Sequence, residues 1–277
     1  MTRFFIFIFS LLFLIAPVHA QERVPSRIIS LGPVITQELY LLGSEDRIVG
    51  VTAYCQRPEA AKLKERVGNV QEINLEKVVA LKPDIVFATV LTDPRAKTKL
   101  RNLGINVIDI PNARDFNEVC DVFLMIGKIV GKDQAARVII AQAKAEVAAL
   151  KEKVSRSPWL SVFVQVGANP LVTIGRGSFV NDLIELAGGV NIVEGAGYLQ
   201  YSKEKIVMSD PDVLLISSMG FDGEREKKNW QKLGVLKAAR QEKIFIIDEY
   251  LLCSPTPLSF ADALKSIMKH LHPEVVL

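Results

Sequence analysis

The sequence predicts an α/β fold of two lobes, each with a mostly parallel sheet, joined by a single long helix with a ligand cleft between the lobes. Short apolar runs alternate with helical patterns on both sides of residues 133–155, and this alternation is typical of parallel sheets covered by helices. Residues 75–88 and 203–216 share Glu-Lys, an apolar pair, Pro-Asp and an apolar run at matching positions. Such internal similarity indicates two related halves.

The connecting segment predicts one helix from Asp133 to Val154. Its apolar residues recur at alternating steps of four and three, which gives one apolar stripe; they are Ala136, Ile140, Ala143, Val147, Leu150 and Val154. Asp133 suits the N-cap position, and Pro158 ends the helix. At 1.5 Å per residue the helix spans about 30 Å, the width of a small domain. We divide the chain into a signal peptide (1–20), an N-terminal lobe (21–132), the connecting backbone helix (133–155) and a C-terminal lobe (156–277).

The N-terminal lobe contains four apolar runs that read as strands. The predicted strands are residues 27–31, 48–51, 85–88 and 107–110, and the predicted helices are 33–43, 74–81, a helix ending at 103, and 115–130. Pro33 suits a helix start, Asn74 an N-cap and Gly43 a helix end. The strand-end loops 52–58, 89–94 and 111–114 lie where open α/β sheets bind ligands.

The C-terminal lobe repeats this pattern. The predicted strands are residues 160–166, 171–174, 213–216 and 244–247, and the predicted helices are 178–187, one beginning near 202, and 258–270. The segments 167–170, 195–201 and 248–255 are expected to be loops. These loops would face those of the first lobe across the cleft.

The first residues predict export. Arg3 gives a positive start, residues 4–15 form an apolar run, and Val18-His19-Ala20 offers a small-residue cleavage site. A membrane anchor is the alternative, but the apolar core is short for a span, which needs about twenty residues. We expect a soluble periplasmic protein whose signal peptide is cleaved.

Charge and histidine placement argue against two functional classes. The formal net charge is +3 from 34 basic and 31 acidic residues, and no basic stripe with interleaved aromatic residues suggests nucleic-acid binding. His19 is expected to leave with the signal peptide, and His270 and His272 lie at the C-terminus, so neither a histidine-based triad nor a clustered histidine metal site has support. We therefore expect a protein that is not an enzyme, with no catalytic residues, no metal site and no intrinsic cofactor. An extracytoplasmic enzyme on the same scaffold is the alternative.

The chain has three cysteines, an odd number for an oxidising compartment. Cys120 falls on an apolar helical stripe and is expected in a core. Cys55 and Cys253 fall in loops of opposite lobes. Two unpaired thiols are the expected state, and a ligand contact or a bridge between the lobes is the alternative.

Several motifs, in order, resemble those of a known family. They are residues 27–33 (RIISLGP), 50–54 (GVTAY), 74–84 (NLEKVVALKPD), 186–192 (LAGGVNI) and 202–204 (SKE). From residue 27 onward the chain resembles the periplasmic binding proteins of importers for vitamin B12, ferric siderophores and haem. The resemblance implies two lobes around a cleft, little hinge closure because the connecting helix is stiff, and delivery of a bulky chelate to an ABC permease with its ATPase subunits. We expect a monomer.

The resemblance also implies site residues. Glu76 and Glu204 match glutamates that pair with permease arginines, although each also suits the positive end of its own helix. Tyr54 matches a ligand-contacting tyrosine of the vitamin B12 binders, and Tyr198 falls where they have a tryptophan. The expected ligand contacts are Tyr54, Cys55, Arg57, Thr89, Gln165, Arg176, Tyr198 and Tyr250.

The preferred ligand is a cobalt corrinoid, because aromatic side chains cover a broad, partly apolar disc well. An iron chelate, either a ferric siderophore or haem, is the alternative. Its anionic groups could pair with arginines, and Tyr54 or Tyr198 could ligate the iron. The arginines in question are Arg57, Arg95, Arg114 and Arg176.

Overall fold

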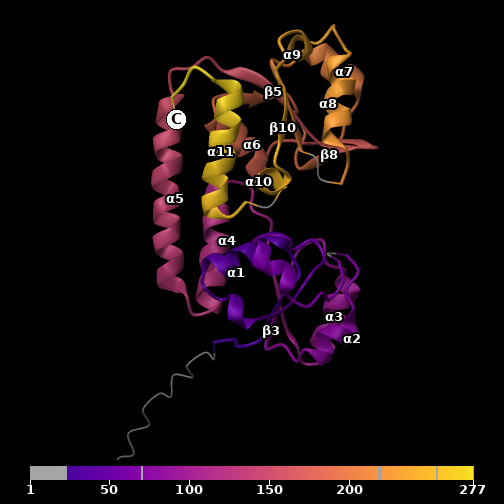
Figure 1. Cartoon of the computed structure of the whole chain (residues 1–277), viewed down its shortest axis with the longest axis vertical. Coiled ribbons are helices and arrows are strands. Elements are labelled where there is room, and N and C mark those ends of the chain that lie inside the picture. The colour runs from indigo at the N-terminus through magenta and orange to yellow at the C-terminus, as the bar shows by residue number, and fades with distance from the viewer. Residues whose placement is uncertain (1–23, 70, 218–219, 254, 277) are drawn as a thin grey trace, which may run out of the picture.

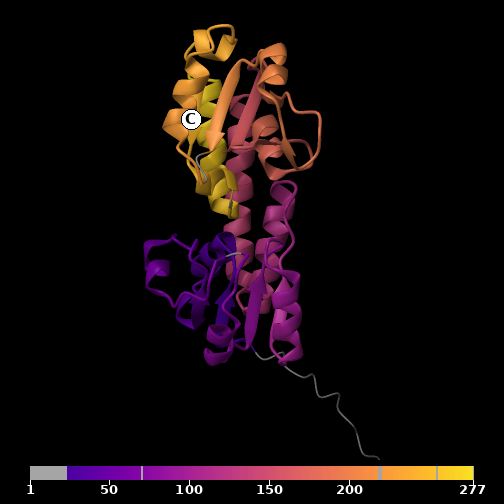
Figure 2. The same ribbon diagram turned by 90° about the vertical axis from the view of Figure 1, so that its right-hand side faces the viewer.

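The computed structural model describes residues 24–69, 71–217, 220–253 and 255–276. The predicted signal peptide lies outside these residues. Two lobes stand one above the other beside a layer of long helices (Figure 1), and a quarter turn shows those helices running from one lobe into the other (Figure 2). The α/β fold with two sheets is as the sequence predicts.

The N-terminal lobe holds a four-stranded, fully parallel sheet. Its strands are β1 (Ile28–Ser30), β2 (Ile48–Val51), β3 (Ile85–Ala88) and β4 (Asn106–Asp109), in the order β2-β1-β3-β4. Successive residues of β1 enter different cores: Ile28 packs with Phe123, and Ile29 with Leu100. Both faces of the sheet are therefore covered, as expected for a parallel sheet. The surrounding helices are α1 (Pro33–Leu41), η1 (Glu45–Arg47), η2 (Glu59–Leu63), α2 (Leu75–Ala80) and α3 (Pro94–Asn102).

The C-terminal lobe has a mixed sheet. Its strands are β5 (Leu160–Ala168), β6 (Leu171–Ile174), β7 (Gly189–Asn191), β8 (Tyr198–Gln200), β9 (Val213–Ser217) and β10 (Ile244–Ile247). The order is β10-β9-β5-β6-β8, and β7 pairs with β5. Strand β9 pairs in parallel with β10 and with β5, and β5 pairs in parallel with β7. The β5–β6 and β6–β8 pairings are antiparallel. The helices of this lobe are α6 (Phe179–Leu186), α7 (Lys203–Ser209), α8 (Gly223–Gln231), α9 (Lys237–Arg240) and α10 (Glu249–Cys253).

Three helices form the helical layer: α4 (Phe116–Ile129) and α5 (Asp133–Lys153) contribute to the cores of both lobes, and α11 (Pro257–Leu271) packs against them in the C-terminal lobe. The predicted stripe of α5 is buried at Ala136, Ala143, Val147 and Leu150. Asp133 is the first helical residue rather than the cap, which is Lys132; the Asp133 carboxylate accepts from Arg137 Nε at 2.9 Å.

Helix α4 joins the lobes as well, which the sequence pattern did not indicate. Phe116, Val119 and Cys120 lie in the main core of the C-terminal lobe, whereas Phe123 and Ile126 lie in a core of the N-terminal lobe. The rings of Phe116 and Phe260 have centroids 4.6 Å apart. The lobes are therefore connected by packed helices and not by α5 alone. The division of the chain at residues 132 and 155 stays a prediction.

The internal repeat is also a structural repeat. Lys82 and Asp210, each one residue before the repeated proline, have φ of 45° and 40°. The aspartate that follows each proline anchors the strand beside it. Asp84 accepts bonds from the Ser26 N–H at 2.6 Å and hydroxyl at 2.7 Å, and Asp212 accepts from the Ser161 N–H at 2.8 Å and hydroxyl at 2.7 Å.

Some elements differ from the sequence prediction. The stretch 195–201 contains β8, because Tyr198 to Gln200 pair with β6. The stretch 248–255 contains α10. Helix α8 lies where no element is predicted, with the Asp222 side chain accepting from the Arg225 N–H at 3.0 Å as a cap.

Candidate functional site

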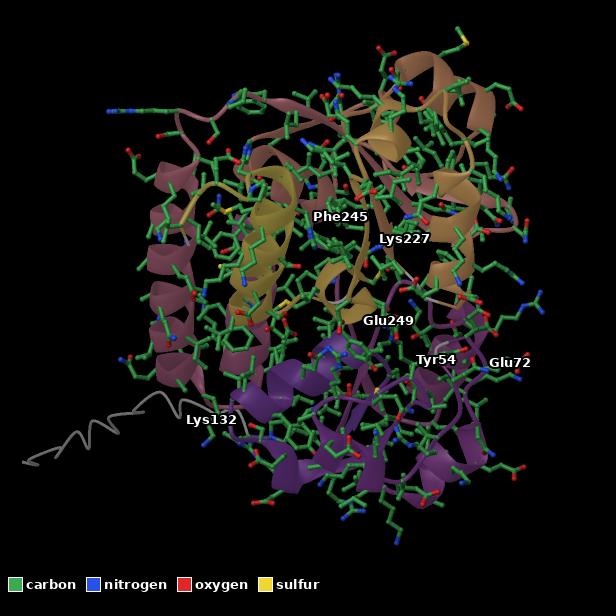
Figure 3. The ribbon with its side chains drawn as sticks, turned by 45° about the horizontal axis from the view of Figure 1, so that its top comes forward. Tyr54, Glu72, Lys132, Lys227, Phe245 and Glu249 are labelled. Atoms are coloured by element: carbon green, nitrogen blue, oxygen red, sulfur yellow. The ribbon has the colours of Figure 1, made fainter. Side chains whose placement is uncertain are left out.

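The carboxyl ends of strands from the two sheets face each other. The loop after β2 carries Tyr54, Gln56 and Arg57, and the residues after β10 carry Asp248 and Tyr250. Hydrogen bonds from Arg57 to Asp248 and from Tyr250 to the Tyr54 carbonyl join these two segments directly. Figure 3 shows Tyr54 of the lower lobe opposite Glu249 of α10. Strand ends of this kind are where open α/β sheets hold ligands.

Large apolar side chains are exposed after two strands of the N-terminal lobe and at the start of β8 in the C-terminal lobe. Tyr54 follows β2 and exposes 59% of its surface; Val90 and Leu91 follow β3 and expose 52% and 61%. In the other lobe Tyr198, the first residue of β8, exposes 63%. Protein nevertheless surrounds the Tyr198 hydroxyl closely enough to raise its pKa, with a further contribution from Cys253.

The hydroxyl of Tyr250 reaches from the C-terminal lobe to the backbone of the N-terminal lobe. It donates to the Tyr54 carbonyl at 2.9 Å and accepts from the Gln56 N–H at 3.3 Å. Burial raises the pKa of this hydroxyl, which stays protonated at neutral pH and can donate. Tyr250 is thus bound to protein rather than open to a ligand.

Arg57 and Asp248 form a bidentate ion pair between the lobes. Arg57 Nη1 and Nη2 donate to the two Asp248 oxygens at 3.1 and 2.7 Å. The guanidinium carbon lies 4.3 Å from the centre of the Tyr250 ring, a cation–π contact. Partial burial opposes ionisation of Asp248, but the hydrogen bonds from Arg57 and the Tyr250 N–H prevail and lower its pKa.

The other expected ligand residues have different surroundings. Gln165 is fully buried: it accepts from Trp230 Nε1 at 2.6 Å and donates to Glu226 at 3.3 Å. Thr89 is half-buried, and its N–H donates to the Thr92 hydroxyl at 3.2 Å. Arg176 is exposed in the turn between β6 and α6. Tyr54 and Tyr198 are thus the two exposed aromatic side chains among the eight.

The cysteines are free in the described part of the chain. Cys120 is buried in the core, as predicted, and burial raises its pKa to about 11. Cys55 is fully buried, with its sulfur 3.2 Å from the Thr52 hydroxyl. Cys253 is half-buried at the end of α10, with its sulfur 3.5 Å from the Ser217 hydroxyl. Each of these last two thiols therefore contacts its own lobe.

Val90 and Leu91 are site candidates that the sequence reasoning missed. They directly follow Thr89 at the end of β3 and are the exposed apolar residues of that loop. The sequence contained a signal for them: two adjacent apolar residues stand in a loop at the carboxyl end of a strand, where they have no core to enter.

The hollows on the surface include two that are lined largely by polar residues. One of about 460 Å³ adjoins the Tyr54 loop at Ala53, and its basic side chains are already bonded: Arg66 donates to the Thr52 carbonyl at 2.6 Å, and Lys77 to Glu65 at 2.6 Å. The other, of about 360 Å³, lies between α4 and α6. The described residues contain no group of three or more His, Cys, Asp or Glu placed to hold a metal ion. None of the described helices is long and apolar enough to cross a membrane.

Glu76 and Glu204 occupy equivalent places in the two lobes. Each is exposed in the first turn of its helix, α2 or α7. The preceding caps are equivalent too, since the Asn74 side chain accepts from the Lys77 N–H at 3.0 Å and the Ser202 hydroxyl from the Lys205 N–H at 3.3 Å. The carboxylates are therefore free to reach solvent at the positive ends of both helices.

Comparison with known proteins places the chain in a family. The model of the periplasmic binding protein family matches residues 28–251. The chain belongs to this family of periplasmic binding proteins.

Two relatives and one solved structure illustrate the match. An uncharacterized ABC transporter substrate-binding lipoprotein of Bacillus subtilis, YvrC, is 28% identical over 91% of this chain and 82% of its own length. A vitamin B12-binding protein of Vibrio cholerae is 27% identical over 94% of both chains. The crystal structure of a periplasmic heme binding protein from Pseudomonas aeruginosa has a TM-score of 0.80 at 24% identity, covering 91% of this chain and 94% of that one. This last likeness establishes the fold.

Proposed function

We propose that this periplasmic binding protein captures a bulky metal chelate between its lobes, with a cobalt corrinoid as the preferred ligand, and delivers it to an ABC permease with its ATPase subunits. The observation that carries the proposal is the set of exposed apolar side chains, Tyr54, Val90 and Leu91 after strands of one lobe and Tyr198, near Cys253 of α10, in the other. A broad ring system lying between two tyrosine faces removes this surface from water at little cost in side-chain entropy.

The ion pairs favour a corrinoid over an anionic chelate. Arg57 is paired with Asp248, and Arg114 with Glu118, whose Oε1 accepts from Arg114 Nε at 2.8 Å. A ligand carboxylate would have to compete with a protein carboxylate for either arginine, which reduces the gain from binding an anion. A corrin ring with amide side chains does not depend on these charges.

Haem or a ferric siderophore is the second candidate. Tyr54 and Tyr198 offer phenol oxygens that can ligate iron, and Arg176 is exposed at the β6–α6 turn for a carboxylate. The solved haem-binding neighbour shares the fold. This candidate is favoured if the isolated protein shows the visible bands of an iron chelate.

Permease docking is assigned to Glu76 and Glu204. Equivalent exposed carboxylates, one in each lobe, fit a partner that presents an arginine to each of them. Export to the periplasm by a cleaved signal peptide, and a monomeric state, complete the proposal.

Absorbance spectra test the ligand. The purified protein is incubated separately with cyanocobalamin, haemin and a ferric siderophore, then desalted; we expect retention of the cobalamin spectrum. Tyr54→Ala combined with Tyr198→Ala should abolish retention, while Leu103→Ala, an exposed apolar residue at the end of α3 beside the amino end of β4, serves as control. Retention of none of the three chelates, or equal retention by the double variant, would contradict the proposal.

A further inference from the structure

Four hydrogen bonds among the described residues connect strand-end segments of the two lobes away from the helical layer. They are the Arg57–Asp248 ion pair and the bonds of the Tyr250 hydroxyl to the backbone of Tyr54 and Gln56. The sequence separation of these partners is 191 to 196 residues. Because α4 and α5 already join the lobes, these contacts make a second, separate connection.

The connection is organised in advance by bonds inside the C-terminal lobe. The Tyr250 N–H donates to Asp248 Oδ1 at 2.8 Å, which orients the same carboxylate that receives Arg57. Asp248 directly follows β10, and Tyr250 lies in α10, so both stand on regular structure. Arg57 stacks on the Tyr250 ring. The ion pair and the tyrosine therefore hold each other in place.

The same contacts also order the loop that carries Tyr54. Tyr250 binds the carbonyl of Tyr54 and the N–H of Gln56, so both sides of this short turn are tied to the opposite lobe. Within the loop, Gln56 N–H also donates to the Tyr54 carbonyl at 2.9 Å. That bond closes only a three-residue turn, which is weak on its own. The residues on either side are held within the N-terminal lobe, since the Ala53 N–H donates to the Gly68 carbonyl at 2.8 Å and Arg66 Nη1 to the Cys55 carbonyl at 3.1 Å. The backbone of Tyr54 and Gln56 thus gains its further support from a side chain of the C-terminal lobe.

We infer that Arg57, Asp248 and Tyr250 form an interlobe clasp, a set of positioning residues that fixes the separation of the lobes and the loop bearing Tyr54. In this role Arg57 and Tyr250 are not ligand contacts. Part of the inference rests on the proposed function, because a fixed separation matters for a ligand held between Tyr54 and Tyr198. A cleft of fixed width selects ligands by thickness and holds them by its rigidity rather than by closing around them.

The clasp is accessible to water. The side chains of Arg57 and Asp248 are 47% and 38% exposed, so salt weakens the ion pair and leaves the Tyr250 hydrogen bonds in place. The two parts of the clasp can therefore be separated experimentally.

Amide hydrogen exchange of the ligand-free protein tests the clasp directly. Tyr250→Phe removes one hydroxyl and keeps the ring beneath Arg57, so we expect exchange at the Gln56 amide to accelerate about tenfold or more. Exchange at the Leu31 amide, which donates to the Phe87 carbonyl within the N-terminal sheet, should stay unchanged. Unchanged exchange at Gln56 would overturn the inference.

Charge variants test the ion pair. Arg57→Gln and Asp248→Asn should each accelerate exchange at Gln56. Because both substitutions break the same ion pair, the double variant should exchange no faster than the faster of the two single variants. The control is Arg137→Gln, which breaks the other bidentate Arg–Asp pair, Arg137–Asp133, within α5. If the Tyr250 variant did not fold, fully additive effects of Arg57→Gln and Asp248→Asn would themselves overturn the clasp.

Ligand kinetics separate the clasp from the proposed function. With cyanocobalamin as probe, Tyr250→Phe should raise the dissociation rate more than the association rate, because the loop under Tyr54 is loosened. Equal rates in the variant and the natural protein would show that the clasp does not position the ligand site. If the natural protein binds no cobalamin while Gln56 still responds to the clasp variants, the proposed ligand fails and the clasp stands.

Discussion

The two lobes share one strand–turn–helix unit and differ in what surrounds it. In both, a helix with an exposed glutamate in its first turn leads through a left-handed residue and a proline to an aspartate that anchors the neighbouring strand. Among the described residues, only the C-terminal sheet has antiparallel pairings, those of β5 with β6 and of β6 with β8. Strand β8, at the edge of this sheet, begins with Tyr198. The repeated unit thus supplies the proposed docking groups, and the added strands supply one wall of the proposed ligand site.

The largest expected effect concerns the shared unit. Replacing Glu76 and Glu204 together with alanine should abolish transport and leave chelate affinity nearly intact, because neither carboxylate lies among the proposed ligand contacts. Uptake by cells that depend on the importer, with binding measured on the purified protein, checks this. Glu224→Ala is the matched control, since Glu224 lies in the first turn of α8. Loss of chelate binding with normal docking would refute the docking role.

The lobes also differ in how they accommodate a buried carboxylate, and the C-terminal lobe does so with hydrogen bonds. Glu226 accepts from Gln165 at 3.3 Å and from Asn229 at 3.1 Å, and Gln165 also accepts from Trp230. Gln165→Leu leaves buried polar groups without partners and should lower the free energy of unfolding by about 2–4 kcal/mol. Chemical denaturation measures this, with Gln142→Leu on the exposed side of α5 as control. A loss no larger than the control's would show that the network is not needed for stability.

The two strand anchors are predicted to differ in strength. Asp212 is partly buried, and although burial opposes its ionisation, hydrogen bonds from Lys237 and Ser161 lower its pKa. Its stabilisation is therefore present above pH 3.8, the ordinary value, and is lost as the pH falls below it. Asp212→Ala should cost about 1–3 kcal/mol at neutral pH, and Asp84→Ala, at an exposed residue, less. Equal losses of unfolding free energy for the two variants in denaturation experiments would show that burial does not make Asp212 the stronger anchor.

The smallest effect concerns the buried carboxylate of the N-terminal lobe. Glu38 is 1% exposed, and its Oε2 has no hydrogen-bond partner in the structure. Burial raises its pKa well above the ordinary 4.5, so the folded protein keeps a proton that the unfolded chain releases as the pH rises. The associated stability is present below pH 4.5 and is lost at higher pH.

Glu38→Gln should therefore stabilise the protein by about 1 kcal/mol near pH 7.5 and give no gain near pH 4. Thermal unfolding midpoints at the two pH values measure the difference. A gain of equal size at both pH values would mean that ionisation of Glu38 is not its cause.

The amino-acid sequence determined most of the local structure. The strands at 48–51, 85–88 and 244–247 lie at their predicted bounds, and Asn74 caps α2 as expected. Apolar periodicity and capping act between residues a few positions apart, so they can be read along the chain. The repeated Glu-to-Asp unit could be recognised for the same reason.

Only the tertiary structure decided which candidate site residues face outward. Gln165 follows apolar residues at the end of a strand and looks like a cleft residue, but Trp230 covers it. Arg57 and Tyr250 resemble ligand contacts in sequence. In the structure Arg57 bonds to Asp248 and Tyr250 to the backbone of Tyr54, partners that lie in the opposite lobe and at least 191 residues away in the chain. Such contacts depend on how two sheets meet in space, and local patterns do not contain that information because the partners are distant in the chain.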